Sequence, residues 1–163
     1  MIVISDTTPL ISLLKVNRLN LLQQLFGYVH IPEAVFQELL ANPRYGEEGQ
    51  IIQASPFIQT HSLGDEKLIR LMCSTVKLDR GEVEAILLAE QLNADYLLMD
   101  EFRGRKVAKS MDLPILGTLG ILIKAYDEKL LSANEVKESM DLMMEHGIRF
   151  SKALYEEILE AVF

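Results

Sequence analysis

Residues 79–100 read DRGEVEAILLAEQLNADYLLMD, and this stretch decides the fold class. Residues 79–93 are rich in Ala, Leu and Glu, which favours a helix. The apolar run at residues 95–99 follows almost at once and is typical of a short buried strand. A helix that leads directly into a buried strand indicates a parallel α/β sheet.

The same alternation continues over the chain to about residue 126. Further strands are predicted at residues 2–5, 28–31, 57–61 and 114–116, and further helices at residues 9–14, 19–26, 32–41, 103–111 and 118–126. Residues 42–50, NPRYGEEGQ, are polar and rich in turn formers, so an exposed loop is expected there. The pattern predicts an α/β fold in which helices flank a parallel twisted sheet of about four or five strands.

The end of the chain differs, and residues 127–163 are expected to form a C-terminal helical extension packed on the same domain as residues 1–126. Ser132 followed by Glu135 is a capping-box signature for the first of its helices. Residues 128–163 hold eight acidic and four basic residues, a net charge of −4, so this helical pair is an unfavourable surface for nucleic acid.

Length and composition indicate one globular domain, with 163 residues of which 49% are hydrophobic and 25% charged. The net charge of −8 argues against a protein that coats nucleic acid, although it leaves room for a small basic patch. The single Cys73 cannot form an internal disulfide and is expected to be a small buried or half-buried packing residue. We find no signal-peptide pattern and no apolar run near the ~18 residues that span a bilayer, so a cytoplasmic location is expected.

Two acidic residues directly follow predicted strands. Asp6 comes after the apolar run at residues 2–4, and Asp100 comes after the run at residues 96–99. Because the carboxyl ends of parallel strands border the ligand crevice of an open sheet, these two carboxylates are expected to meet in space. A structural role is the alternative, since an Asp at a helix start can accept hydrogen bonds from free backbone amides.

Glu82 and Glu38 join these acids as candidates. Glu82 lies three residues after Asp79, so these two residues could also be a capping box with no other function. Glu38 borders the apolar stripe of its predicted helix, where an unpaired acid is unusual. Glu84 and Glu90, on the same predicted helix as Glu82, are expected to face solvent.

Four carboxylates that converge need a cation, because like charges 4 Å apart repel by about 4 kcal/mol per pair at an effective dielectric of about 20. Oxygen-only ligands select hard ions, so Mg²⁺ or Mn²⁺ is the expected cofactor. His30, His61 and His146 are too scattered in the sequence for a zinc motif and are expected to be ordinary surface or packing residues. A metal held by carboxylates supports phosphodiester hydrolysis, since it activates water and stabilises charge on the phosphate.

The densest basic cluster of the chain follows Asp100 directly and consists of Arg103, Arg105, Lys106 and Lys109. A solvated helix face would explain it without any function. Because the cluster adjoins a candidate metal ligand, we expect Arg103 and Arg105 to contact substrate phosphates.

Four segments, taken in order, carry a family resemblance: VISDTTPLISL (3–13), IPEAVFQEL (31–39), LDRGEVEAILLAEQLNADYLLMDEFRGRKVA (78–108) and LPILGTLGIL (113–122). Their order and spacing resemble the PIN-domain superfamily, and most closely its small prokaryotic members akin to VapC toxins. The resemblance covers roughly residues 1–126, and the C-terminal part is similar to the helical extension of that subgroup.

The resemblance implies a metal-dependent ribonuclease selective for single strands, most often the toxin of a toxin–antitoxin pair. It places the acidic quartet of the family on Asp6, Glu38, Glu82 and Asp100. It also places Thr7 and Thr118 at hydroxyl positions beside the site, where we expect nucleic-acid contacts. Many relatives form homodimers and pair with a small antitoxin protein, so both are expected partners.

Two other Asp-dependent folds lack necessary residues in this sequence. A haloacid-dehalogenase-type phosphatase needs a second Asp two residues after the first, and Thr8 stands there. A receiver domain needs paired acids after the first strand and a Lys after the last, but Ser5 and the stretch 116–118 do not supply them. Two interpretations stay open beside the nuclease: a weak or inactive PIN-like protein that binds RNA, and a protein-interaction module whose tail docks a regulator.

Overall fold

The structure, a computed structural model, describes residues 1–163. In chain order its elements are β1 (Val3–Ser5), α1 (Thr7–Lys15), α2 (Asn20–Phe26), β2 (Val29–Pro32), α3 (Glu33–Ala41), α4 (Gly46–Ala54), β3 (Ile58–His61), α5 (Glu66–Val76), α6 (Arg80–Gln91), β4 (Tyr96–Leu98), α7 (Phe102–Ser110), β5 (Ile115–Leu116), α8 (Thr118–Asp127), α9 (Ala133–Glu145) and α10 (Lys152–Val162). None of the helices combines the length and the apolarity that crossing a membrane requires.

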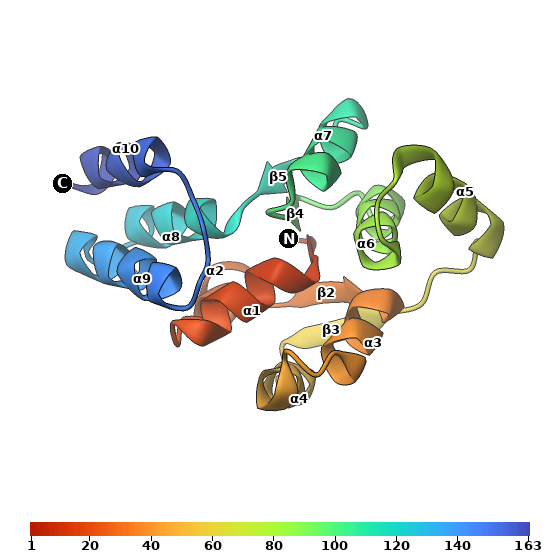
Figure 1. Ribbon diagram of the computed structural model, residues 1–163, viewed down its shortest axis with the longest axis horizontal. Helices are drawn as coiled ribbons and strands as arrows, with labels where there is room; N and C mark the ends of the chain where they lie inside the picture. The colour runs from red at the N-terminus through yellow and green to blue at the C-terminus, as the bar shows by residue number, and fades with distance from the viewer.

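The strands form one parallel five-stranded sheet in the order β3-β2-β1-β4-β5 (Figure 1). Ile4 of the central strand β1 pairs with His30 of β2 on one side and with Leu97 of β4 on the other. The chain moves from β1 out to β3 and then crosses back to β4, so the strand order reverses between β1 and β4. Such a switch point is where open parallel sheets bind ligands. The predicted α/β class and parallel sheet are confirmed.

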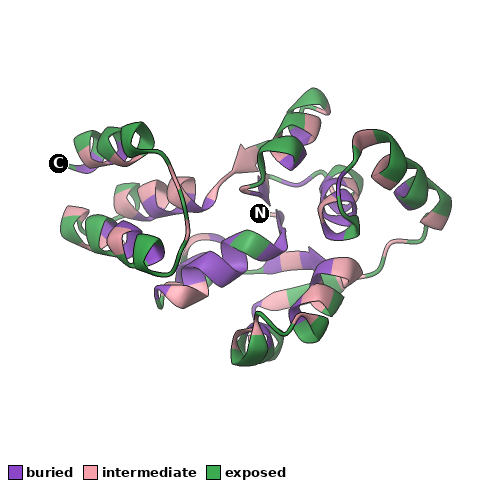
Figure 2. Ribbon diagram, viewed as in Figure 1, coloured by how far each residue is buried: buried purple, intermediate pink, exposed green.

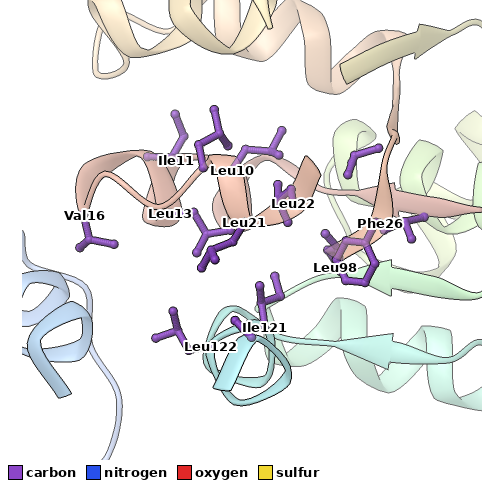
Figure 3. Close-up of a cluster of buried hydrophobic side chains, with 14 of the residues drawn as sticks. Leu10, Ile11, Leu13, Val16, Leu21, Leu22, Phe26, Leu98, Ile121 and Leu122 are labelled. Carbon is purple, nitrogen blue, oxygen red and sulfur yellow. The ribbon is translucent and has the colours of Figure 1, made fainter. Parts of the chain in front are cut away.

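Helices cover both faces of the sheet, and successive strand residues point to opposite faces. Val3 and Leu98 belong to a core of 25 buried residues that the sheet forms with α1, α2, α8 and the C-terminal helices. Figure 3 shows the part of this core in which aliphatic side chains of α1, α2 and α8 meet. Ile4 and Leu97 belong instead to a second core of 13 buried residues, formed with α5, α6 and α7.

Several element boundaries have the local causes that the sequence predicts. Asp79 and Ser132 both form complete capping boxes, at the starts of α6 and α9. Gly27 adopts φ 78° directly after α2, a conformation that a residue with a Cβ rarely takes. These signals come from residues that are close together in sequence, so they can be identified before the fold is known.

The exposed loop predicted at residues 42–50 is wrong in its second half, because α4 begins at Gly46. Ile52 of this helix is fully buried in the larger core. A Cβ at Gly49 would collide with the backbone carbonyl of Leu39, so α4 can lie against α3 only because a glycine stands there. Tertiary packing therefore decides a segment whose composition favours a loop.

Helix α5 has no counterpart among the predicted elements. It contacts α6 and buries only Ile69, while Leu68 and Leu71 are 39% and 62% exposed. Asp65 caps its first turn by accepting a hydrogen bond of 3.1 Å from the backbone N–H of Leu68.

The C-terminal helices α9 and α10 lie beside α8 at one end of the molecule (Figure 1). Figure 2 shows that their outward faces are exposed. Their buried apolar side chains belong to the same core as α1 and α2: Val136, Met140, Met143, Ile158 and Val162. The boundary between a domain at residues 1–126 and an extension at residues 127–163 stays a prediction.

Candidate active site

Asp6 lies where β1 ends and α1 begins, and it is only 5% exposed. Its backbone N–H donates a hydrogen bond of 3.0 Å to the carbonyl of Leu98, which ties the ends of β1 and β4 together. Asp6 occupies the N-cap position of α1, yet its side chain makes no capping hydrogen bond. The carboxylate is therefore buried at the switch point, and the usual capping bond of an N-cap Asp does not account for it.

Glu38 reaches the same region from α3. The hydroxyl of Thr7 donates a hydrogen bond of 2.8 Å to Oε2 of Glu38, so the residue that follows Asp6 also positions the second acid. The hydroxyl of Tyr45 lies 3.5 Å from the other oxygen, Oε1. Burial raises the pKa of Tyr45, and the charge of Glu38 raises it further, so this phenol stays protonated and can donate.

Glu82 and Asp79 form the predicted capping box at the start of α6. The backbone N–H of Glu82 donates to Asp79 at 2.8 Å, and the backbone N–H of Asp79 donates to Glu82 at 3.0 Å. Gly81 lies between these residues, and a Cβ there would be 3.4 Å from carboxylate oxygens of both Asp79 and Glu38. The start of α6 therefore brings two acids towards Glu38.

The charges of these acids act on one another. Burial raises the pKa of Asp6 to about 7, the backbone N–H of Thr7 opposes this effect, and the negative charges of Asp79, Glu82 and Glu38 reinforce it. Burial also raises the pKa of Glu82, with contributions from nearby acids. None of these carboxylates forms an ion pair, since the ion pairs of the structure involve other residues.

Asp100 follows β4, the strand next to β1, and is held by the start of α8. The backbone N–H and the hydroxyl of Thr118 donate hydrogen bonds of 2.7 and 2.5 Å to its two oxygens. Thr7 and Thr118 are both buried, and their hydroxyls are engaged with Glu38 and Asp100. Their roles as nucleic-acid contacts stay predictions, and in this structure they position acids.

Arg105 lies beside Asp100 at the start of α7. Its guanidinium donates a hydrogen bond of 3.0 Å to the carbonyl of Met99. A Cβ at Gly117 would lie 2.7 Å from Nη1 of Arg105 and 3.1 Å from Oδ1 of Asp100, so both groups pack against this glycine. Arg103 is exposed, and neither arginine forms an ion pair, which leaves both free for an anion.

The chemistry of these donors fits a hard divalent cation, because they are carboxylate oxygens without a positive partner. In this conformation, however, no three acidic, histidine or cysteine side chains are arranged to hold a metal ion. The structure brings Asp6, Glu38 and Glu82 near one another and adds Asp79, which the sequence explained as a helix cap alone.

One sequence expectation beside the site is wrong. Glu84 was expected to face solvent but is 3% exposed, and it accepts hydrogen bonds of 3.2 Å from the N–H of Ala34 and 2.6 Å from Arg80. It thereby caps the start of α3 from α6. His30 and His61, scattered in sequence, lie on neighbouring strands with ring nitrogens 2.7 Å apart.

A comparison with protein-family models matches residues 2–162 to a family described as DUF3368: PIN domain. Comparisons with curated proteins and with solved structures gave no match. PIN domains are generally nucleases and typically use divalent metals. The family match covers nearly the whole chain, and it agrees with a five-stranded parallel sheet that has acids at its switch point. The chain belongs to the PIN-domain superfamily.

Proposed function

We propose that this protein is a metal-dependent endoribonuclease that cleaves the phosphodiester bonds of single-stranded RNA. One observation carries the proposal: Asp6, Glu38 and Glu82 lie near one another at the switch point of the sheet without any ion pair. Asp6 is buried and Glu38 and Glu82 are half-buried, and carboxylates in such surroundings with no positive partner are costly unless a cation joins them. Membership of a superfamily whose proteins are generally nucleases supports the assignment.

Four side chains would hold an Mg²⁺ or Mn²⁺ ion: Asp6, Glu38, Glu82 and Asp100. Asp79 is a fifth candidate, because its charge acts on Asp6. The chemistry that such an ion supplies when bound is an acidified water and neutralisation of phosphate charge. The chain itself fixes the carboxylates, since Thr7 orients Glu38 and Thr118 orients Asp100. Arg103 and Arg105 would contact substrate phosphates, where a guanidinium can donate two hydrogen bonds at once.

The likeness to VapC toxins extends the proposal to a biological role. We assign the protein as the toxin of a toxin–antitoxin pair, acting as a homodimer and neutralised by a small antitoxin protein. Growth arrest on expression, relieved by a neighbouring gene, would support this role, and unimpaired growth would contradict it. A molecular mass equal to that of one protomer, measured by light scattering, would contradict the homodimer and leave the toxin assignment unaffected.

Cleavage of labelled single-stranded RNA in Mn²⁺ tests the catalytic assignment. We expect Asp6→Asn and Glu82→Gln each to reduce the cleavage rate by at least about 100-fold, because each removes one negative ligand. Gln at position 82 can still accept the capping hydrogen bond, so this change removes charge while keeping the start of α6. Glu90→Gln is the matched control, since Glu90 is an exposed acid on the same helix.

The outcomes separate the proposal from its alternatives. Full activity in both Asp6→Asn and Glu82→Gln would show that the assigned roles are wrong. RNA binding by the wild type without turnover in any divalent metal would favour the inactive RNA-binding protein over the nuclease.

A further inference from the structure

A cavity of about 950 Å³ opens directly beside the candidate active site. Its walls come from α1, the start of α7, the start of α8, and the connection between α9 and α10. Asp100 and Thr118 line it, and so do Arg149 and Phe150 of the α9–α10 connection. The cavity is therefore continuous with the candidate active site, and the C-terminal helices bring part of its lining.

The cavity carries positive charge in an otherwise acidic protein. Arg105 and Arg149 both line it, and neither takes part in an ion pair. By contrast, Lys137 and Lys152 of α9 and α10 are paired with acids one turn away. The hydrogen bond from Arg105 to the carbonyl of Met99 fixes its guanidinium and leaves its other donors free. In a chain with a net charge of −8, two free guanidinium groups at one cavity favour an anionic occupant.

The cavity also presents aromatic rings. Phe150 lies parallel to Tyr155, with ring centroids 6.2 Å apart and an interplanar angle of 6°. The hydroxyl of Tyr155 donates a hydrogen bond of 2.7 Å to Asp141, so this ring is fixed in turn. Phe102 also lines the cavity and is 75% exposed. A fixed phenyl ring beside unpaired arginines is the combination that stacks a nucleobase and binds its phosphate.

We propose that this cavity is a nucleotide subsite, which binds the base of an unpaired nucleotide next to the scissile phosphate. Phe150 stacks on the base, and Arg149 and Arg105 contact the flanking phosphates. The inference rests on the proposed nuclease function and adds a substrate-binding role for the α9–α10 connection. The helices themselves are acidic, as the sequence indicated, but the connection between them supplies an unpaired arginine and an aromatic ring. A bound peptide is the alternative occupant of the cavity. Unpaired arginines beside a candidate nuclease site favour RNA over a peptide.

Fluorescence anisotropy with a labelled single-stranded oligoribonucleotide tests the subsite, in EDTA so that metal-dependent cleavage cannot occur. We expect Phe150→Ala to weaken binding by roughly 5- to 100-fold through lost stacking. Phe150→Leu keeps an apolar contact with Tyr155 and should weaken binding as well, so a folding defect in Phe150→Ala does not decide the result. An oligonucleotide with one abasic position in the subsite should bind wild type and Phe150→Leu equally.

Arg149→Gln should weaken binding, and the slope of log affinity against log salt concentration should become shallower by about one, because one fewer counterion is released. Arg70→Gln and Phe163→Ala are matched controls, because Arg70 is an exposed arginine on α5 and Phe163 is a 70% exposed ring outside the cavity. Helix α5 lies at the opposite end of the molecule from α10 (Figure 1). Both controls should bind the oligonucleotide like the wild type.

Cleavage in Mn²⁺ is measured in parallel, so that the subsite and the nuclease can fail separately. Wild-type affinity in all variants at positions 149 and 150, with cleavage intact, would overturn the subsite and leave the nuclease standing. Affinity lost in these variants, with no cleavage by any protein, would support the subsite and overturn the nuclease. A wild type that neither binds nor cleaves the oligonucleotide would overturn both.

Discussion

Among single residues, Asp6 has the clearest energetic consequence. An ordinary Asp has a pKa of about 3.9, whereas burial raises the pKa of Asp6 to about 7, even against the opposing effect of the N–H of Thr7. Neighbouring acids add to this effect, and no Lys or Arg offsets it through an ion pair. The metal-free protein therefore holds a carboxyl group that resists ionisation near neutral pH.

This raised pKa predicts an unusual pH dependence of stability. Between about pH 4 and pH 7 the folded protein keeps the proton on Asp6 while the unfolded chain releases it, so the free energy of unfolding falls as pH rises. We expect Asp6→Asn to abolish this fall in the free energy of unfolding. Above about pH 7 the variant should be more stable than the metal-free wild type by as much as about 4 kcal/mol. Urea unfolding in EDTA, below about pH 4 and above about pH 7, measures this difference. Parallel pH profiles for the two proteins would contradict the prediction.

Sequence patterns singled out Asp6 and Asp100 because each follows an apolar strand. They did not single out Asp79, because its role as a helix cap already accounted for it. They placed Glu84 in solvent, because its partner at Ala34 lies fifty residues away and comes close only in the fold. A carboxylate that satisfies a distant backbone N–H looks like any surface acid until the tertiary structure is known.

At the scale of elements, α4 shows how packing overrides local preference. Gly49 permits its close approach to α3, since a Cβ there would meet the carbonyl of Leu39. The segment contains Gly46 and Gly49, and glycine disfavours a helix on its own. No helix is predicted at α5, although Ile69, Met72, Cys73 and Val76 recur at helical spacing and pack against the second core. Helix α6, which begins with a complete capping box, is predicted within a residue or two.

Gly49→Ala tests this explanation of α4. Helix propensity alone would make the change stabilising by up to about 1 kcal/mol, whereas the collision with the carbonyl of Leu39 should destabilise the protein by about 1 to 3 kcal/mol. Gly64→Ala is the control, because no atom lies within 4 Å of a Cβ there. Chemical unfolding of both variants decides the matter, and a Gly49→Ala protein at least as stable as the wild type would show that the close approach is not needed.

At the scale of the whole molecule, the order of the strands places the acids. Alternating helices and strands predicted a parallel sheet, but alternation does not fix which strands are neighbours. The order β3-β2-β1-β4-β5 puts the ends of β1 and β4 side by side, and Asp6 and Asp100 follow these two strands in the chain. Two of the arginines that form no ion pair, Arg105 and Arg149, line the cavity that α7 and the α9–α10 connection share, and Asp100 lines the same cavity. The fold thus gathers acidic residues that are distant in sequence at the candidate site, and it places Arg105 and Arg149 at the adjoining cavity.

The proposed function requires that Asp6, Glu38, Glu82 and Asp100 bind one class of hard divalent cation. Titration of Mn²⁺ into the metal-free protein, followed by electron paramagnetic resonance, tests it without reference to any RNA. The account predicts that wild type and Glu90→Gln bind Mn²⁺ alike, and that Asp6→Asn and Glu82→Gln bind it at least about 10-fold more weakly. Failure of the wild type to bind Mn²⁺, or wild-type affinity in both Asp6→Asn and Glu82→Gln, would contradict it.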